Sequence, residues 1–112
     1  MNVTSYGNVT ADSVTQMQAA LAKQPLAVSI EADTRVFQSY SSGVLNNTAC
    51  GTNLDHAVLT VGWGTDASAG DYWLVKNSWG TTWGEKGYIR LAIVNGAGIC
   101  GVQMEPETVA TN

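Results

Sequence analysis

Residues 71–94 read DYWLVKNSWGTTWGEKGYIRLAIV, and this stretch decides the fold. It contains two runs rich in aromatic and β-branched residues, 71–79 and 87–94, which is the composition typical of β-strands. The segment between them, GTTWGEK, contains glycines and polar residues and reads as a turn. We therefore expect the two runs to pair as antiparallel neighbours in one sheet.

Two further strands are expected upstream of this pair. Residues 57–64, AVLTVGWG, form another β-rich run, and residues 26–31, LAVSIE, alternate between an apolar and a more polar face, as a half-buried strand does. Between them, residues 34–40 predict a short helical turn and residues 41–53, SSGVLNNTACGTN, a polar loop.

One helix is expected over residues 13–23. Its apolar residues recur at helical spacing, Ser13 and Gln16 form a capping box at its start, and Pro25 ends it. The apolar positions are Val14, Met17, Ala20 and Leu21. The predicted fold class is α+β, an antiparallel, barrel-like sheet with this N-terminal helix packed on it. Because the sequence contains no repeat or linker, residues 1–112 are expected to form a single domain.

Composition and charge argue against several classes of function. Charged residues make up 12% of the chain, about half the usual ~25%, so part of the surface suits another protein segment better than water. The net charge is −4, and the five lysines and arginines are scattered, which argues against a nucleic-acid partner. The apolar runs are far shorter than the ~18 residues of a membrane span, so no membrane association is expected. No cofactor motif is present.

The two cysteines, Cys50 and Cys100, have two interpretations from the residues alone. They form a disulfide closing a loop of about 50 residues, or they are two small buried thiols. Sequons for N-glycosylation at Asn2, Asn8 and Asn46 favour an oxidising secretory route. One histidine and two cysteines are too few ligands for a zinc site, so no metal is expected.

The single histidine lies in LDHAVLT, residues 54–60, at the head of a predicted strand. Asn77 ends another predicted strand, so the tips of neighbouring strands can bring His56 and Asn77 together. An asparagine oxygen can accept the imidazole N–H and fix the ring, and Trp79 can then cover the pair and exclude water. In the alternative interpretation, His56 is a core residue, Asn77 closes a turn, and Trp79 packs in the core.

Together, LDHAVLTVGWG, DYWLVKNSWGTTWGEKGYIRL and GICG resemble the C-terminal half of papain-like cysteine proteases, the fold that includes the cathepsins. The KNSWG-x-x-WGE-x-GY string is long and specific. QPLAVSIEA and FQSYSSGV extend the resemblance upstream, so that it covers nearly the whole chain. The resemblance implies a cysteine-type peptidase built around a cleft between two domains, of which this chain is the β-rich right domain.

The resemblance also implies a role for each matching residue. His56 matches the catalytic histidine, Asn77 the asparagine that orients it, and Trp79 the indole that shields their hydrogen bond. Asp55 matches a modulating carboxylate beside the histidine. Cys50 and Cys100 match the disulfide of this half, so neither is expected to be the nucleophile.

The nucleophilic cysteine of the family is absent from this sequence. In the family it opens a helix in the N-terminal half, within a C-G-x-C-W-type string, and no such string occurs here. Met1 precedes residues that fall mid-protein in the family, so the chain is expected to begin at an artificial or processed boundary. The expected partners are therefore a complementary N-terminal domain that carries the cysteine, a peptide or protein substrate, and, in the full enzyme, a propeptide or cystatin-like inhibitor.

Specificity in the family is dominated by the pocket for the second substrate residue before the cut. Ser29 and Ala57 match wall positions, and Glu105 matches the floor, where an acidic group favours a basic substrate residue. The tail MEPETVATN departs from the family's usual Tyr-Pro, so the alternative that Glu105 is a solvated surface charge stays open.

The expected function is that of one half of a papain-like endopeptidase, which supplies the base and part of the pocket and is inactive alone. The expected location is lysosomal, vacuolar or extracellular. The alternative is a non-enzymatic binding or folding module that keeps the domain's shape, with His56 and Asn77 as remnants.

Overall fold

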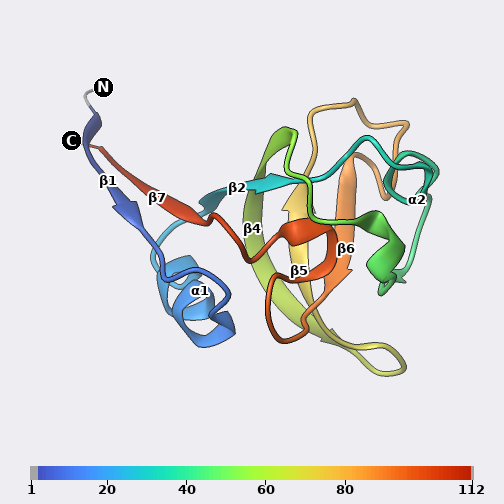
Figure 1. The fold of residues 1–112 in the computed structure, drawn as a ribbon, viewed down its shortest axis with the longest axis horizontal. Coiled ribbons are helices and arrows are strands. Elements are labelled where there is room, and N and C mark those ends of the chain that lie inside the picture. The colour runs from blue at the N-terminus through green and yellow to red at the C-terminus, as the bar shows by residue number, and fades with distance from the viewer. Residues whose placement is uncertain (1–2, 112) are drawn as a thin grey trace.

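The computed structural model describes residues 3–111 as one curled sheet with a helix on one side (Figure 1). The described sheet has seven strands in the order β1-β7-β2-β4-β5-β6-β3. The strands are β1 Val3–Asn8, β2 Leu26–Ile30, β3 Val44–Leu45, β4 His56–Asp66, β5 Gly70–Lys76, β6 Tyr88–Ala92 and β7 Glu107–Thr111. The helices are α1 Val14–Leu21 and α2 Arg35–Gln38, with 3-10 turns η1 Thr48–Cys50 and η2 Ile99–Gly101.

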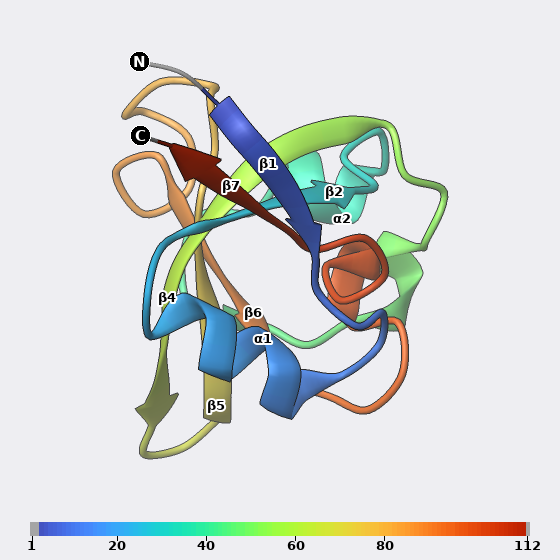
Figure 2. The same ribbon diagram turned by 90° about the vertical axis from the view of Figure 1, so that its left-hand side faces the viewer.

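The predicted α+β class with a barrel-like sheet is confirmed. Neighbouring strands are antiparallel along the described sheet except at its end, where β3 lies parallel to β6. Strand β4 bends at a bulge between Thr60 and Gly62, and such an extra residue increases the local twist. Figures 1 and 2 show β4 arching over the molecule, while the β1–β7 ribbon extends from one side of the sheet.

The one strand pair expected from the sequence is present, and three strands were not predicted. Strands β5 and β6 pair across residues 80–86 as expected. Residues 41–53, predicted to be a loop, contain β3 and η1, so this prediction was wrong in part. A strand of two residues is too short to show an alternating pattern in the sequence. Strands β1 and β7, VTSYGN and ETVAT, were missed because they lack a sustained apolar alternation and pair chiefly with each other.

Helix α1 packs its apolar stripe on the sheet, as its spacing predicts. Met17 and Leu21 are buried, and Ala20 is partly buried against the core. The Ser13 hydroxyl accepts the backbone N–H of Gln16 at 3.4 Å, which supplies one half of the predicted capping box. Figure 2 shows α1 lying across the sheet below the β1–β7 ribbon. No helix among the described residues is long and apolar enough to cross a bilayer.

A buried polar link joins the centre of the sheet to the C-terminal turns. Trp73 and Gln103 are both fully buried. The Trp73 indole N–H donates to Gln103 Oε1 at 3.1 Å, and Gln103 Nε2 donates to the carbonyls of Val94 at 2.8 Å and Gly96 at 2.9 Å. Because each polar atom of the Gln103 side chain has a partner, the residue can be buried without an unsatisfied group.

The disulfide implied by the resemblance is present between Cys50 and Cys100. Both half-cystines are buried, and they join η1 to η2. The Cys100 carbonyl accepts the backbone N–H of Glu31 at 2.9 Å. The bridge therefore fixes the loop before β4 against the segment that leaves β2.

A bidentate ion pair connects β6 to the turn before it and to the residue before β3. Arg90 donates from Nε to Glu85 Oε1 at 2.8 Å and from a terminal nitrogen to Glu85 Oε2 at 2.9 Å. Glu85 Oε2 also accepts the backbone N–H of Gly43 at 3.1 Å. The Arg90 guanidinium holds the pKa of the Glu85 carboxyl below its ordinary value, and the Gly43 bond acts in the same direction.

We predict that replacing both half-cystines, Cys50→Ala with Cys100→Ala, lowers the free energy of unfolding by roughly 4 kcal/mol, the chain-entropy value for a 50-residue loop. Urea unfolding followed by tryptophan fluorescence measures the change. Reduction of the unmodified chain is the control and should give a similar loss. A variant within about 1 kcal/mol of the parent would contradict the anchoring role.

We predict that Glu85→Gln lowers stability by roughly 1 kcal/mol at neutral pH. Because the folded-state pKa of Glu85 is depressed, its contribution is present above the ordinary carboxyl pKa and is lost as pH falls through the folded value. The difference between parent and variant should therefore shrink in acid, as measured by urea unfolding across pH. Glu107→Gln, at an exposed carboxylate, is the control. A difference independent of pH would contradict the ion-pair account.

Candidate active site

Strand register brings His56 and Asn77 to the same face. His56 begins β4, and Asn77 directly follows the last residue of β5. Leu59 lies opposite Lys76, so continuing the antiparallel register by one residue places Asn77 opposite Val58. His56 is two residues before Val58 and shares its face, which makes His56 and Asn77 diagonal neighbours within reach of each other.

The two side chains are joined by a hydrogen bond. His56 Nε2 lies 2.8 Å from Asn77 Oδ1, and the same oxygen accepts the backbone N–H of Ser78 at 2.8 Å. Because a carbonyl oxygen only accepts, the proton sits on His56 Nε2, and in the neutral ring Nδ1 keeps its lone pair. Asn77 is 6% exposed, so it is a fixed support. The arrangement can hold an imidazole ready to take a proton at Nδ1.

Trp79 lies over this pair. Its ring is stacked on the His56 imidazole, with the centroids 5.4 Å apart and the planes at 29°. Phe37 of α2 also packs edge to face with Trp79, with the ring centroids 5.2 Å apart, and Trp83 does the same at 5.5 Å. Sequence reasoning missed the support from Phe37, although the apolar residue within TRVFQSY was its signal. Helix α2 thus fixes the indole that covers the histidine.

Asp55 lies beside His56 but bonds elsewhere. Its Oδ1 accepts the backbone N–H of Ala32 at 2.8 Å, and no described hydrogen bond joins it to the imidazole. Asp33 is exposed next to it, and hydrogen bonding to Glu31 raises the pKa of the Asp33 carboxyl above its ordinary value. Acidic groups therefore border the histidine on this side.

Two hollows flank the pair. One, of about 230 Å³, is lined by Ala32, Asp33, Gln38, Asp55, His56 and Trp79. The other, of about 370 Å³, is lined by Ala57, Val58, Leu59, Lys76, Asn77 and Ser78. Leu59 is 38% exposed there. The histidine thus lies between an acidic hollow and an apolar one, both open to a ligand or another chain.

The residues expected at the specificity pocket lie on adjacent segments. Ser29 of β2 and Ala57 of β4 are direct cross-strand partners. Glu105 is exposed in the turn before β7, and β7 reaches β2 where Glu107 pairs with Ala27. The structure therefore brings Ser29 and Ala57 together, while no described contact joins Glu105 to either.

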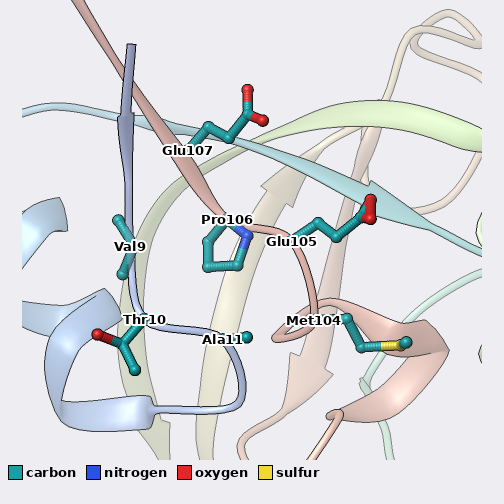
Figure 3. A pocket seen from close by; sticks show the side chains of 7 residues that line it. All are labelled: Val9, Thr10, Ala11, Met104, Glu105, Pro106 and Glu107. Atoms are coloured by element: carbon teal, nitrogen blue, oxygen red, sulfur yellow. The ribbon is translucent and has the colours of Figure 1, made fainter.

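Glu105 also borders a separate pocket of about 520 Å³, and His56 is not among the residues that line it. Its lining is Val9, Thr10, Ala11, Met104, Glu105, Pro106 and Glu107 (Figure 3). Figure 3 shows the carboxylate of Glu105 directed away from Thr10 and the Pro106 ring. Within residues 3–111, no group of three or more histidine, cysteine, aspartate or glutamate side chains is placed to hold a metal ion.

Comparison with known families and proteins gives consistent matches. Residues 1–110 match the family described as papain family cysteine protease. The cysteine proteinase RD21A of Arabidopsis thaliana is 45% identical over 108 residues, which are 95% of this chain and 23% of that protein. The cysteine endopeptidase Rep1 of Oryza sativa subsp. japonica is 47% identical over 105 residues, which are 92% of this chain and 28% of that protein. The chain thus spans about a quarter of the length of these curated relatives.

Solved structures share the fold. The bromelain protease from Ananas comosus, in complex with the E64 inhibitor, superposes with a TM-score of 0.90 at 42% sequence identity. The superposition covers 98% of this chain and 51% of the bromelain chain. The cysteine protease Amb a 11, a ragweed pollen allergen solved in its proform, gives a TM-score of 0.93 at 38% identity, covering 100% of this chain and 34% of that one.

We predict that Asn77→Ala releases the His56 ring. Without the acceptor at 2.8 Å, the population of the Nε2-protonated tautomer should fall toward the mixture of a free imidazole. Nitrogen-15 chemical shifts of the ring measure the tautomer directly. Ser78→Ala, which keeps the backbone N–H that binds Asn77, is the matched control. Unchanged ring shifts in Asn77→Ala would contradict the orienting role.

Proposed function

The chain belongs to the papain family of cysteine proteases, and we propose that it is the C-terminal, β-rich half of such a peptidase. In this proposal His56 is the catalytic base and acid, and Asn77 is the residue that positions it. The observation that carries the proposal is the 2.8 Å bond between His56 Nε2 and Asn77 Oδ1 beneath the indole of Trp79.

The chemistry follows from the free Nδ1 of His56. That nitrogen takes the proton of a cysteine thiol, and the thiolate attacks the carbonyl carbon of the substrate peptide. As the C–N bond breaks, the imidazolium returns the proton to the leaving amine. Water then attacks the thioester carbon while His56 takes one of the water protons, the C–S bond breaks, and the released thiolate is left paired with the imidazolium. At every stage Nε2–H stays bonded to Asn77, so the ring keeps one orientation.

Trp79 and Asp55 have supporting roles in this proposal. Trp79 keeps water from the bond between His56 and Asn77, which strengthens it in a low local dielectric. The Asp55 carboxylate accepts the backbone N–H of Ala32, which fixes the segment beside His56, and it adds negative charge near the imidazole. Neither residue touches the reacting carbonyl.

The nucleophile is proposed to come from a complementary N-terminal half. Both cysteines of the sequence are buried in the disulfide between Cys50 and Cys100, so neither supplies a thiolate. The exposed Leu59 and Trp79 border the catalytic pair and suit the packing of another domain. The chain alone is therefore expected to be inactive.

Substrate preference is proposed to be set by Ser29, Ala57 and Glu105. The cross-strand pair of Ser29 and Ala57 forms a wall of small side chains, which leaves room for a large substrate residue. Glu105 at the floor favours a basic residue at the second position before the cut. A propeptide or cystatin-like inhibitor would occupy the same cleft. The disulfide supports a secretory route to a vacuole, a lysosome or the exterior.

We predict no turnover by the purified chain alone on a fluorogenic peptide with a basic residue at that second position. Mass spectrometry should find no covalent adduct with a thiol-directed epoxide, because both sulfurs are in the disulfide. The Cys50→Ala, Cys100→Ala variant is the background control. Turnover that the epoxide blocks, and that this variant lacks, would mean that one of these cysteines is a working nucleophile, and the proposal would be wrong.

A further inference from the structure

We propose that Asn46 is an acceptor for an N-linked glycan, a modification that rests on the secretory route proposed above. Asn46, Asn47 and Thr48 form an N-x-Thr sequon. The side-chain nitrogen of Asn46 forms a bond to the anomeric carbon of a lipid-linked oligosaccharide. The bond from that carbon to the lipid diphosphate breaks, and the released diphosphate takes up the proton that the amide loses.

The structure separates the two neighbouring asparagines. Asn47 uses its side-chain oxygen to accept the backbone N–H of Ala49 at 2.9 Å, which caps η1. Asn46 is exposed, and its side chain has no hydrogen bond among the described residues. The sequon therefore selects the asparagine whose amide is free, and a glycan there displaces no contact of the fold.

The position of Asn46 in the sheet gives the glycan a physical role. Asn46 directly follows β3, which is the last strand in the sheet order and pairs with β6 at Leu45 and Leu91. β3 is therefore the edge strand at this end of the described sheet, and proteins limit pairing of such edges with other chains by keeping them short or covering them. A glycan at Asn46 would cover this edge. In the sheet order β3 is separated from β4, which carries His56, by β5 and β6.

The order of synthesis keeps the sequon open. Cys50, at the end of η1, is four residues after Asn46. Its disulfide partner, Cys100, follows 50 residues after Cys50. At roughly 5–20 residues per second, roughly 3 to 10 s of synthesis separate the two cysteines. The disulfide cannot restrain η1 in that interval, so a transferase meets Asn46 in an unfolded segment.

The other two sequons lie in parts of the chain where the structure says less about the asparagine side chain. Asn8 lies within β1, where its backbone pairs with Glu107 of β7. Asn2 lies outside the described residues. Asn46 is the one of the three whose side chain the structure describes, and that side chain is exposed and makes no described hydrogen bond.

The test is expression of the full chain behind a supplied secretory signal in a eukaryotic host. Cell-associated and secreted material are pooled and digested, and the peptide that contains Asn46 is analysed by mass spectrometry before and after a glycan-removing amidase. We expect a glycan on Asn46 that the amidase removes, leaving aspartate. Asn46→Gln and Thr48→Ala should each lose it. Asn47→Gln keeps the sequon and is the matched control that should retain it.

Because transfer precedes folding and retained chains are included, a variant that folds poorly still reports on the acceptor. An Asn46 peptide found unmodified in chains that carry the disulfide between Cys50 and Cys100 would overturn the proposal, as would glycan on Asn8 alone. The measurement involves no peptide hydrolysis. Its failure would therefore leave the peptidase proposal standing, and an inactive enzyme would leave the glycan standing.

Discussion

The antiparallel register between β4 and β5 is the constraint on which the candidate active site depends. It sets Leu59 opposite Lys76 and so carries His56 and Asn77 to one face of the sheet. A slip of one residue would turn Asn77 to the other face and remove the acceptor from the imidazole. The bulge after Thr60 curls β4 beyond this point without disturbing the pairing nearest the histidine. The hydrogen bond of 2.8 Å is a consequence of that register.

Contacts between segments far apart in the sequence fix the loops and strands that surround the β4–β5 pair. The disulfide between Cys50 and Cys100 fixes the loop that leads into β4, and buried Gln103 ties the C-terminal turns to Trp73 in β5. Helix α2 contributes Phe37, which supports the indole over the histidine. Each link joins parts far apart in sequence, so the His56 ring is positioned by contacts from several segments rather than by its own strand alone.

The sequence predicts the strands and the site unequally. The period-2 pattern of residues 26–31 and the β-rich runs 57–64, 71–79 and 87–94 predict β2, β4, β5 and β6, because their burial decides their composition. The pairing of His56 with Asn77 is predictable once both are placed at strand tips. The bond of Asp55 to the backbone of Ala32 and the support from Phe37 were not predictable, because they depend on loop paths that no periodic pattern encodes.

The central proposal is that His56 takes the proton of a cysteine thiol that a complementary N-terminal half supplies. Its most direct test joins this chain to the N-terminal half of the bromelain protease and measures kcat/KM on a fluorogenic peptide. The account predicts turnover that a thiol-directed epoxide blocks and that His56→Ala lowers by roughly 10³-fold or more. A folded chimaera whose kcat/KM is unchanged by His56→Ala would contradict it.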